Sequence, residues 1–258
     1  MTEPVIEVDG LDVYRGGEKV IDDATFTVDG GDYVGIVGPN GGGKSTLIKA
    51  ILGSLPHRAG TIRLFGELIE GFRGWSKLAY VSQDAIFFDS HFPLNARELV
   101  GLGRIRRGNL GRRLKPDDWR IVDDTMETMG ISDIAEHRIG NLSGGQKQRI
   151  FVAKALVRSP DVLILDEPVT GIDFDAQKRF YMKLSNLCLE RGTTILHVSH
   201  DLSAVFCRMN KVLAVNGRVY VSEVDVSADP NTLLRKAYGD HFHFTFHRHI
   251  CEGLFEVE

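Results

Sequence analysis

One short segment of this chain combines residue types that bind phosphate groups. Residues 38–45 read Gly-Pro-Asn-Gly-Gly-Gly-Lys-Ser and lie between an apolar run and a helical pattern. The glycines let backbone amides turn toward phosphates, Lys44 supplies a positive charge, and Ser45 offers a hydroxyl to Mg²⁺. We predict a nucleotide-phosphate site here; the alternative is a glycine-rich turn with a fortuitous lysine.

A second segment places two carboxylates where an apolar strand ends. Residues 162–165 read Val-Leu-Ile-Leu, and Asp166 and Glu167 follow directly. Beside a phosphate site, Asp166 can hold Mg²⁺ and Glu167 can polarise an attacking water. Because successive strand side chains point to opposite faces, we expect the pair to divide these roles. The alternative is a strand-terminal pair that caps the next helix.

A third segment begins a helix with small polar residues. Ser143, Gly144, Gly145 and Gln146 precede apolar residues at helical spacing. Unpaired amides at such a helix start, with glycines that allow close approach, favour a second phosphate site. A plain helix cap at Ser143 is the alternative, and the local sequence does not decide between them.

The elements that position these segments alternate between strands and helices. Apolar runs predict strands at residues 24–28, 33–37, 61–65, 78–82, 162–165, 194–198 and 211–215. Helical spacing predicts helices from Gly43 to a stop at Gly53, at residues 175–191 and at residues 201–207. Residues 84–158 show no convincing strand, which predicts a mostly helical insertion in an α/β fold.

Composition excludes several classes of protein. The 258 residues carry 31 Lys+Arg and 35 Asp+Glu, a net charge of −4, which argues against nucleic-acid binding by phosphate neutralisation. No apolar run approaches the roughly 18 residues of a membrane span. The first residues lack a secretory signal pattern, and Cys188, Cys207 and Cys251 form no CxxC pair. We therefore expect a protein of a reducing, cytosolic compartment.

Together and in this order, the three segments resemble those of the ATP-binding cassette (ABC) family of transport ATPases. The resemblance covers about residues 5–240 and implies a P-loop NTPase (RecA-like) α/β core with an antiparallel β subdomain and a helical subdomain inserted at about residues 84–158. It implies one domain over residues 1–240, followed by a tail at 241–258. It also implies ATP and Mg²⁺ as cofactors and ATP hydrolysis as the activity.

The resemblance assigns roles residue by residue. It implies that Glu167 activates water, that His200 and Gln83 sense the γ-phosphate, and that Lys44 binds phosphate. Mg²⁺ would be held by Ser45, Gln83 and Asp166. The remaining nucleotide contacts implied are Tyr14 on adenine, Gly38, Pro39, Asn40, Gly41, Gly42, Gly43 and Thr46 in the loop, and Ser143, Gly144, Gly145, Gln146 and Asp173 across a dimer. His197, inside an apolar strand, is interpreted as structural.

Partners follow from the same resemblance. A chain without a membrane span would power transport through separate permease subunits, as a homodimer on the cytoplasmic face of the membrane, with an external solute-binding protein and no nucleic acid. Residues 87–93, Phe-Phe-Asp-Ser-His-Phe-Pro, are apolar enough to receive a partner's helix, or else fill their own core. A basic run at residues 104–115 is either a solvated loop or a contact with lipid headgroups or the partner.

The carboxyl end bears on the cargo. His241, His243, His247 and His249 are four of nine histidines, and with Cys251 they would share one face of a strand. Imidazole and thiolate suit zinc and related metals, although a docking strand explains them as well. The phosphate loop and this ending resemble the zinc and manganese uptake branch. The alternatives are an importer for another solute and a non-transport ABC ATPase in DNA repair or translation.

Overall fold

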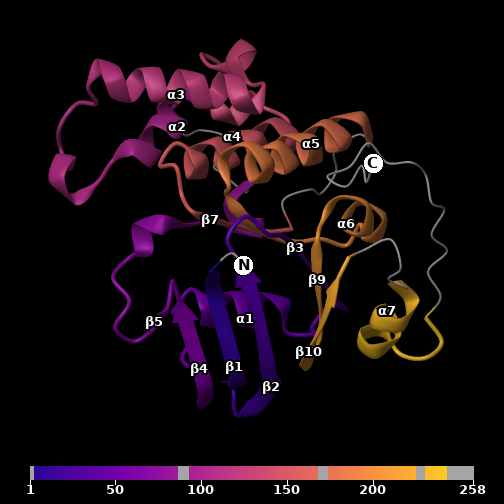
Figure 1. Cartoon of the computed structure of the whole chain (residues 1–258). Helices are drawn as coiled ribbons and strands as arrows, with labels where there is room; N and C mark the ends of the chain where they lie inside the picture. The colour runs from indigo at the N-terminus through magenta and orange to yellow at the C-terminus, as the bar shows by residue number, and fades with distance from the viewer. Residues whose placement is uncertain (1–2, 87–92, 168–173, 225–229, 243–258) are drawn as a thin grey trace. The chain divides into compact units, whose positions relative to one another are not determined.

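The computed structural model describes residues 3–86, 93–167, 174–224 and 230–242 (Figure 1). The chain divides into two compact units, one of residues 1–75 and 187–258 and the other of residues 76–186. The predicted helical insertion at residues 84–158 lies within the second unit. In the part of the chain that the structure describes, no helix is long and apolar enough to cross a membrane.

An antiparallel sheet forms the first half of the first unit. Its strands are β1 (Pro4–Arg15), β2 (Glu18–Asp29), β4 (Ala59–Leu64) and β5 (Glu67–Leu68), in the order β2-β1-β4-β5. β1 and β2 form a hairpin whose turn has positive φ angles at Gly16 and Gly17. Ile6, Val8 and Leu11 of β1 are buried, and the observed β2 starts earlier than the predicted strand at residues 24–28.

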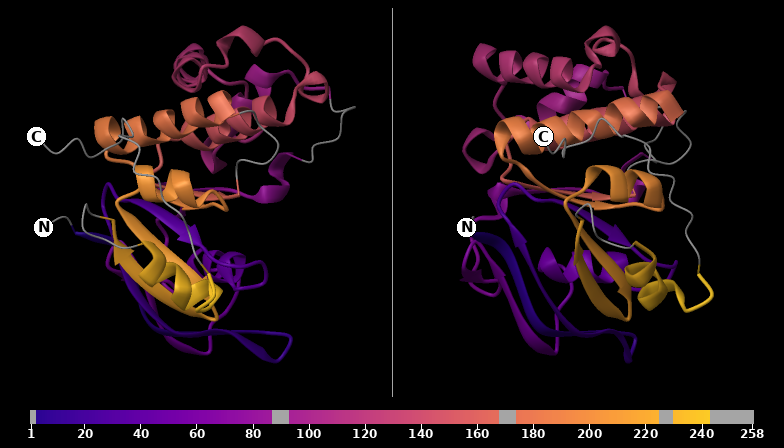
Figure 2. Two further views of the ribbon diagram at one scale, coloured as in Figure 1. Left: turned by 90° about the vertical axis from the view of Figure 1, so that its right-hand side faces the viewer. Right: turned by 45° about the vertical axis from the view of Figure 1, so that its right-hand side comes forward.

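Parallel strands form the second half of the first unit. β3 (Tyr33–Val37) pairs in parallel with both β8 (Thr194–Val198) and β9 (Lys211–Asn216), and β10 (Arg218–Glu223) pairs antiparallel with β9. Every residue of β3 and β8 is buried, which explains their continuous apolar sequences. The helices of this unit are α1 (Lys44–Ile51), α6 (Leu202–Arg208) and α7 (Pro230–Tyr238), and α7 packs on the β9–β10 hairpin (Figure 2).

The second unit is mainly helical around one parallel strand pair. β6 (Leu78–Val81) pairs with β7 (Val162–Asp166), and helices α2 (Ala96–Gly101), α3 (Pro116–Met129) and α4 (Gly144–Leu156) contact one another (Figure 1). α5 (Phe174–Arg191) spans the division between the units. Between residues 84 and 158, the described backbone forms only one isolated bridge, Asn95 to Arg138. The helical character predicted for this region is therefore confirmed.

Short 3₁₀ turns lie along the chain between β5 and α4. They are η1 (Trp75–Lys77), η2 (Gln83–Ile86), η3 (Leu102–Arg104), η4 (Arg107–Asn109), η5 (Ser132–Ile134) and η6 (Ile139–Asn141). On α3, Val122, Met126 and Met129 are buried and form its core face. The sequence patterns did not predict β10 or α7. β10 is an edge strand without a buried residue, whereas α7 does carry helix signals, Pro230 at its start and Gly239 after its end.

Candidate functional site

The glycine-rich loop lies between β3 and α1, where a phosphate loop is expected. Gly38 has φ +147, and a Cβ there would lie 2.0 Å from the backbone oxygen of Val215. Gly43 has φ +103 at the N-cap of α1, and a Cβ would lie 2.8 Å from Ile21 Cδ1. Both positions therefore require glycine for backbone angle and for space. The loop is built for close approach of its backbone to a ligand.

Lys44 bends back over this loop. Its Nζ donates to the backbone oxygens of Gly38, at 2.9 Å, and Pro39, at 3.1 Å, and the residue is only 5% exposed. Ser45 at the start of α1 is exposed, whereas Thr46 is buried. The positive charge, the helix start and the hydroxyl therefore gather at one loop, a combination that favours anion binding. The other loop residues are Asn40, Gly41 and Gly42, of which Asn40 and Gly41 are exposed.

Tyr238 joins this loop from the far end of the sequence. Its hydroxyl accepts a hydrogen bond from the backbone N–H of Gly38 at 3.0 Å, and its ring stacks on Phe242 with centroids 4.6 Å apart. Burial raises the pKa of Tyr238, so the hydroxyl stays protonated. Asn216 holds α7 by donating to the backbone oxygen of Ala237 at 2.8 Å. Tyr238 was not among the predicted site residues.

Tyr14 lies on β1, opposite Lys19 of β2. The guanidinium of Arg58 sits over its ring, 4.4 Å from the centroid, an arrangement typical of a cation–π contact. Adenine stacking on Tyr14 stays a prediction, and a base would use the ring face opposite Arg58. The sequence pattern did not indicate Arg58.

His200 and His197 have different surroundings. His200 follows β8 and is exposed, at a turn where Ser199 Oγ accepts from the N–H of Asp201. His197 is fully buried, and its Nδ1 lies 3.1 Å from the Tyr33 hydroxyl. Burial lowers the pKa of His197 to about 3, so the ring is neutral. The structural interpretation of His197 is therefore supported, and the γ-phosphate role of His200 stays a prediction.

The second unit gathers the predicted carboxylates with Gln83. Gln83, at the start of η2, donates from Nε2 to Glu167 Oε2 at 2.8 Å. Asp166 is buried at the end of β7, and the hydroxyl of Tyr80 donates to its Oδ2 at 3.1 Å. Burial and the Asp166 charge raise the pKa of Tyr80, so it remains a donor. Sequence reasoning missed Tyr80, although it lies on the predicted strand that leads to Gln83.

Glu167 differs from its expected conformation. β7 ends at Asp166, and Glu167 has φ +48, in the left-handed region. Strand alternation therefore does not reach Glu167, which is no longer extended, and the division of roles between the two carboxylates stays a prediction. Its backbone turn directs its side chain to Gln83 instead. A non-glycine residue in this conformation stores strain of about 1–3 kcal/mol, which is typical of functional sites.

Ser143 is the N-cap of α4. Its Oγ accepts from the N–H of Gln146 at 3.3 Å, and its own N–H donates to Gln146 Oε1 at 2.9 Å. The plain cap that the sequence left open is therefore present. It does not exclude anion binding, since Ser143 and Gly144 are exposed at the helix start and Gly145 is half-buried.

Several predicted site residues lie outside the described part of the chain. These are Asp173, the partner-binding residues 87–92, and His243, His247, His249 and Cys251 of the tail. His241 is described and exposed. Among the residues with described positions, no group of three or more His, Cys, Asp or Glu side chains could hold a metal ion.

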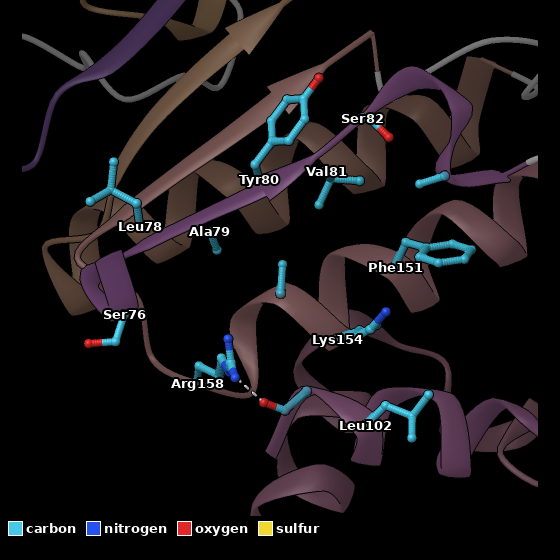
Figure 3. A pocket seen from close by; sticks show the side chains of 13 residues that line it. Ser76, Leu78, Ala79, Tyr80, Val81, Ser82, Leu102, Phe151, Lys154 and Arg158 are labelled. Atoms are coloured by element: carbon cyan, nitrogen blue, oxygen red, sulfur yellow. Dashed lines mark hydrogen bonds between the residues drawn. The ribbon is translucent and has the colours of Figure 1, made fainter. Parts of the chain in front are cut away.

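A pocket of about 360 Å³ opens in the second unit, between β6 and the C-terminal half of α4 (Figure 3). Leu78, Phe151 and Leu102 give it apolar surface, and Leu102 is 39% exposed. Lys154 and Arg158 line the pocket from the same side as Phe151 (Figure 3). Burial and the charge of Arg158 lower the pKa of Lys154. Arg158 donates to the backbone oxygens of Gly103, at 2.7 Å, and Ile105, at 2.6 Å.

Comparison with known proteins relates this geometry to a family. Residues 21–170 match the family model described as ABC transporter. The zinc uptake system ATP-binding protein ZurA of Listeria innocua is 40% identical, over 83% of this chain and 84% of its own. The manganese transport system ATP-binding protein MntB of Bacillus subtilis is 33% identical, over 96% of this chain and 98% of its own.

Solved structures agree in fold. CbiO1 of Clostridium perfringens, part of the ABC transporter complex cbiONQ, has a TM-score of 0.75 and 28% identity, over 86% of this chain and 89% of its own. An inward-facing metal-chelate type ABC transporter has a TM-score of 0.78 and 23% identity, over 92% of this chain and 89% of its own. The latter likeness concerns the fold alone.

Proposed function

The chain belongs to the ABC transporter family and is one of its ATP-hydrolysing subunits, and from this premise we propose that it powers the import of a divalent metal ion, zinc or manganese. The observation that carries the proposal is the match to zinc and manganese uptake ATPases over most of the chain. The phosphate loop and the hydrogen bond from Gln83 to Glu167 support hydrolytic competence.

The donor atoms of the site fit Mg²⁺. Ser45, Gln83 and Asp166 offer hydroxyl, amide and carboxylate oxygens, the ligands that this hard cation prefers. The Tyr80 hydroxyl donates to Asp166 Oδ2, and Gln83 donates from its nitrogen to Glu167, so the Asp166 carboxylate and the Gln83 amide oxygen would face the metal or its waters from oriented side chains. When bound, Mg²⁺ neutralises charge on the β- and γ-phosphates.

The side chains divide the work of hydrolysis. Lys44 and the loop amides bind the phosphates, and His200 contacts the γ-phosphate. Glu167 accepts the proton of the attacking water, with Gln83 holding its other carboxylate oxygen in place. Tyr80, whose hydroxyl stays protonated, keeps the Asp166 carboxylate oriented by donating a hydrogen bond to it. We assign adenine stacking to Tyr14.

Closure of two copies completes each site in this proposal. The Ser143 turn of one copy would bind the γ-phosphate held by the loop of the other, with Asp173 at the same junction. The capped start of α4 supports this role, since its exposed end favours an anion. ATP binding then closes the homodimer and hydrolysis opens it.

The pocket beside β6 suits the permease partner. Its apolar residues and its two cations, Lys154 and Arg158, favour a short permease segment with apolar and acidic side chains. The dimer would then sit as a peripheral complex on the cytoplasmic face of the membrane. An external solute-binding protein would deliver the metal. A metal contact by the tail requires His241, the remaining tail histidines and Cys251 to share one ion.

The metal assignment is tested by growth. A strain without this gene should grow poorly when zinc or manganese is limiting, and addition of that metal alone should restore growth. The Glu167→Gln variant should fail to complement, whereas the wild-type gene should succeed. Rescue by some other solute, with no response to either metal, would identify a different importer.

A further inference from the structure

The loop between α2 and α3 carries the densest positive charge of the chain. Residues 104–115 read Arg-Ile-Arg-Arg-Gly-Asn-Leu-Gly-Arg-Arg-Leu-Lys, with no acidic residue, in a protein whose net charge is −4. We call residues 104–115 the basic loop. The ATPase mechanism uses none of its side chains.

The basic loop has a defined backbone anchored at its base. Arg104 donates from Nε to Asp118 Oδ1 at 2.9 Å and from Nη1 to the backbone oxygen of Val157 at 3.1 Å. Asn109 donates to the backbone oxygen of Arg104 at 3.1 Å and accepts from the N–H of Arg106. Arg158 holds the backbone of Gly103 and Ile105 from the other side. These bonds set the direction in which the loop extends.

Three arginines of the basic loop lie beyond this base. Arg106, Arg112 and Arg113 are exposed, and they form no ion pair with any acidic side chain in the described part of the chain. Asp118 is committed to Arg104 at 2.8 Å, and Asp117 lies 3.4 Å from Arg120. These three arginines line a hollow of about 440 Å³ together with Arg104, Lys115 and the acidic residues Asp117 and Asp118, so its cationic residues outnumber its carboxylates. Such a hollow suits a phosphate-bearing ligand.

An apolar side chain stands among these cations. Leu110 is 74% exposed, the largest value for any large apolar residue whose position is described. A solvated loop gains nothing by exposing a leucine at its tip. In a loop that contacts a bilayer, two interactions stabilise binding: the cations attract anionic headgroups, and the leucine enters the boundary of the acyl chains.

We infer that the basic loop is a membrane-contact surface, in which Arg106, Arg112 and Arg113 bind the phosphate groups of anionic lipids and Leu110 inserts among them. The orientation rests on the proposed function. Leu102, Gly103 and Arg158 line the pocket assigned to the permease, and Arg158 also binds Ile105 at the start of the basic loop. A permease segment in that pocket would bring the loop to the headgroups beside it.

The test is flotation of the full chain with vesicles of phosphatidylcholine alone or mixed with phosphatidylglycerol. Binding should require phosphatidylglycerol and weaken at high salt. The double variant Arg112→Glu, Arg113→Glu should lower the partition coefficient at least roughly tenfold, and Leu110→Ser about fivefold. The matched control is Lys178→Glu, Arg179→Glu, an equal charge reversal at adjacent exposed positions of α5, which should bind like the wild type.

Three results would overturn the inference. The first is vesicle binding that does not depend on phosphatidylglycerol. The second is an equal loss of vesicle binding in the control variant Lys178→Glu, Arg179→Glu. The third is binding of inorganic phosphate by the chain without any binding to vesicles, which would indicate a soluble anion instead. ATP turnover, measured in parallel, keeps the two proposals apart. Lost lipid dependence with normal turnover removes only this inference, whereas absent turnover with intact lipid binding removes only the proposed function.

Discussion

At the scale of single residues, chemistry depends on side chains that hold one another in place. Asp166 and Glu167 are neighbours in sequence, yet each has its own partner, Tyr80 for Asp166 and Gln83 for Glu167. The left-handed backbone of Glu167 makes this possible, since it turns the second carboxylate away from the line of β7. Two adjacent acids therefore obtain separate surroundings, which supports the separate roles proposed for them.

Glu167→Gln tests the assignment of the base. The change preserves shape and removes the proton acceptor, so ATP should still bind while hydrolysis slows by about two to four orders of magnitude. Turnover and nucleotide affinity, measured on the purified chain, separate the two effects. Glu190→Gln, at an exposed position of α5, is the control and should turn over normally. Full activity in Glu167→Gln would assign water activation to another group.

At the scale of elements, the pairing of β3 with β8 buries a titratable ring. Gly35 pairs with His197, and Tyr33 bonds the imidazole from β3. The folded state keeps His197 neutral because its pKa is lowered to about 3 by burial, whereas the unfolded chain protonates it near its usual value. Between these two values the unfolded state binds more protons, so stability falls as the pH decreases.

This predicts an acid sensitivity that one substitution removes. Below the usual histidine pKa, the free energy of unfolding should decrease by about 1.4 kcal/mol per pH unit from His197 alone. Urea unfolding at mildly acidic and neutral pH measures the slope. His197→Phe should flatten it, while Tyr33→Phe should keep it. An unchanged slope in His197→Phe would mean that other groups govern the acid response.

At the scale of the whole molecule, the proposed mechanism needs a second copy of the chain. One chain carries one phosphate loop and one Ser143 turn, so the proposed closed state needs two chains. Glu167→Gln with ATP and Mg²⁺ should accumulate as a dimer in light scattering. Adding Ser143→Arg should return it to monomers, because the guanidinium fills the phosphate position, whereas Ser132→Arg, exposed on η5, should not. Dimers that persist with Ser143→Arg would place the interface elsewhere.

Features encoded by residues close together in the chain could be predicted from the sequence. They are the strand, glycine turn and helix around Lys44, the helix start after Ser143, the apolar strand before Asp166 and the helical region at residues 84–158, which follow from local periodicity and turn chemistry. Which distant groups meet depends on the packing of the folded chain. Tyr238 reaches Gly38, Tyr80 reaches Asp166, and Arg58 covers Tyr14, because packing joins segments whose spacing along the chain carries no signal of contact.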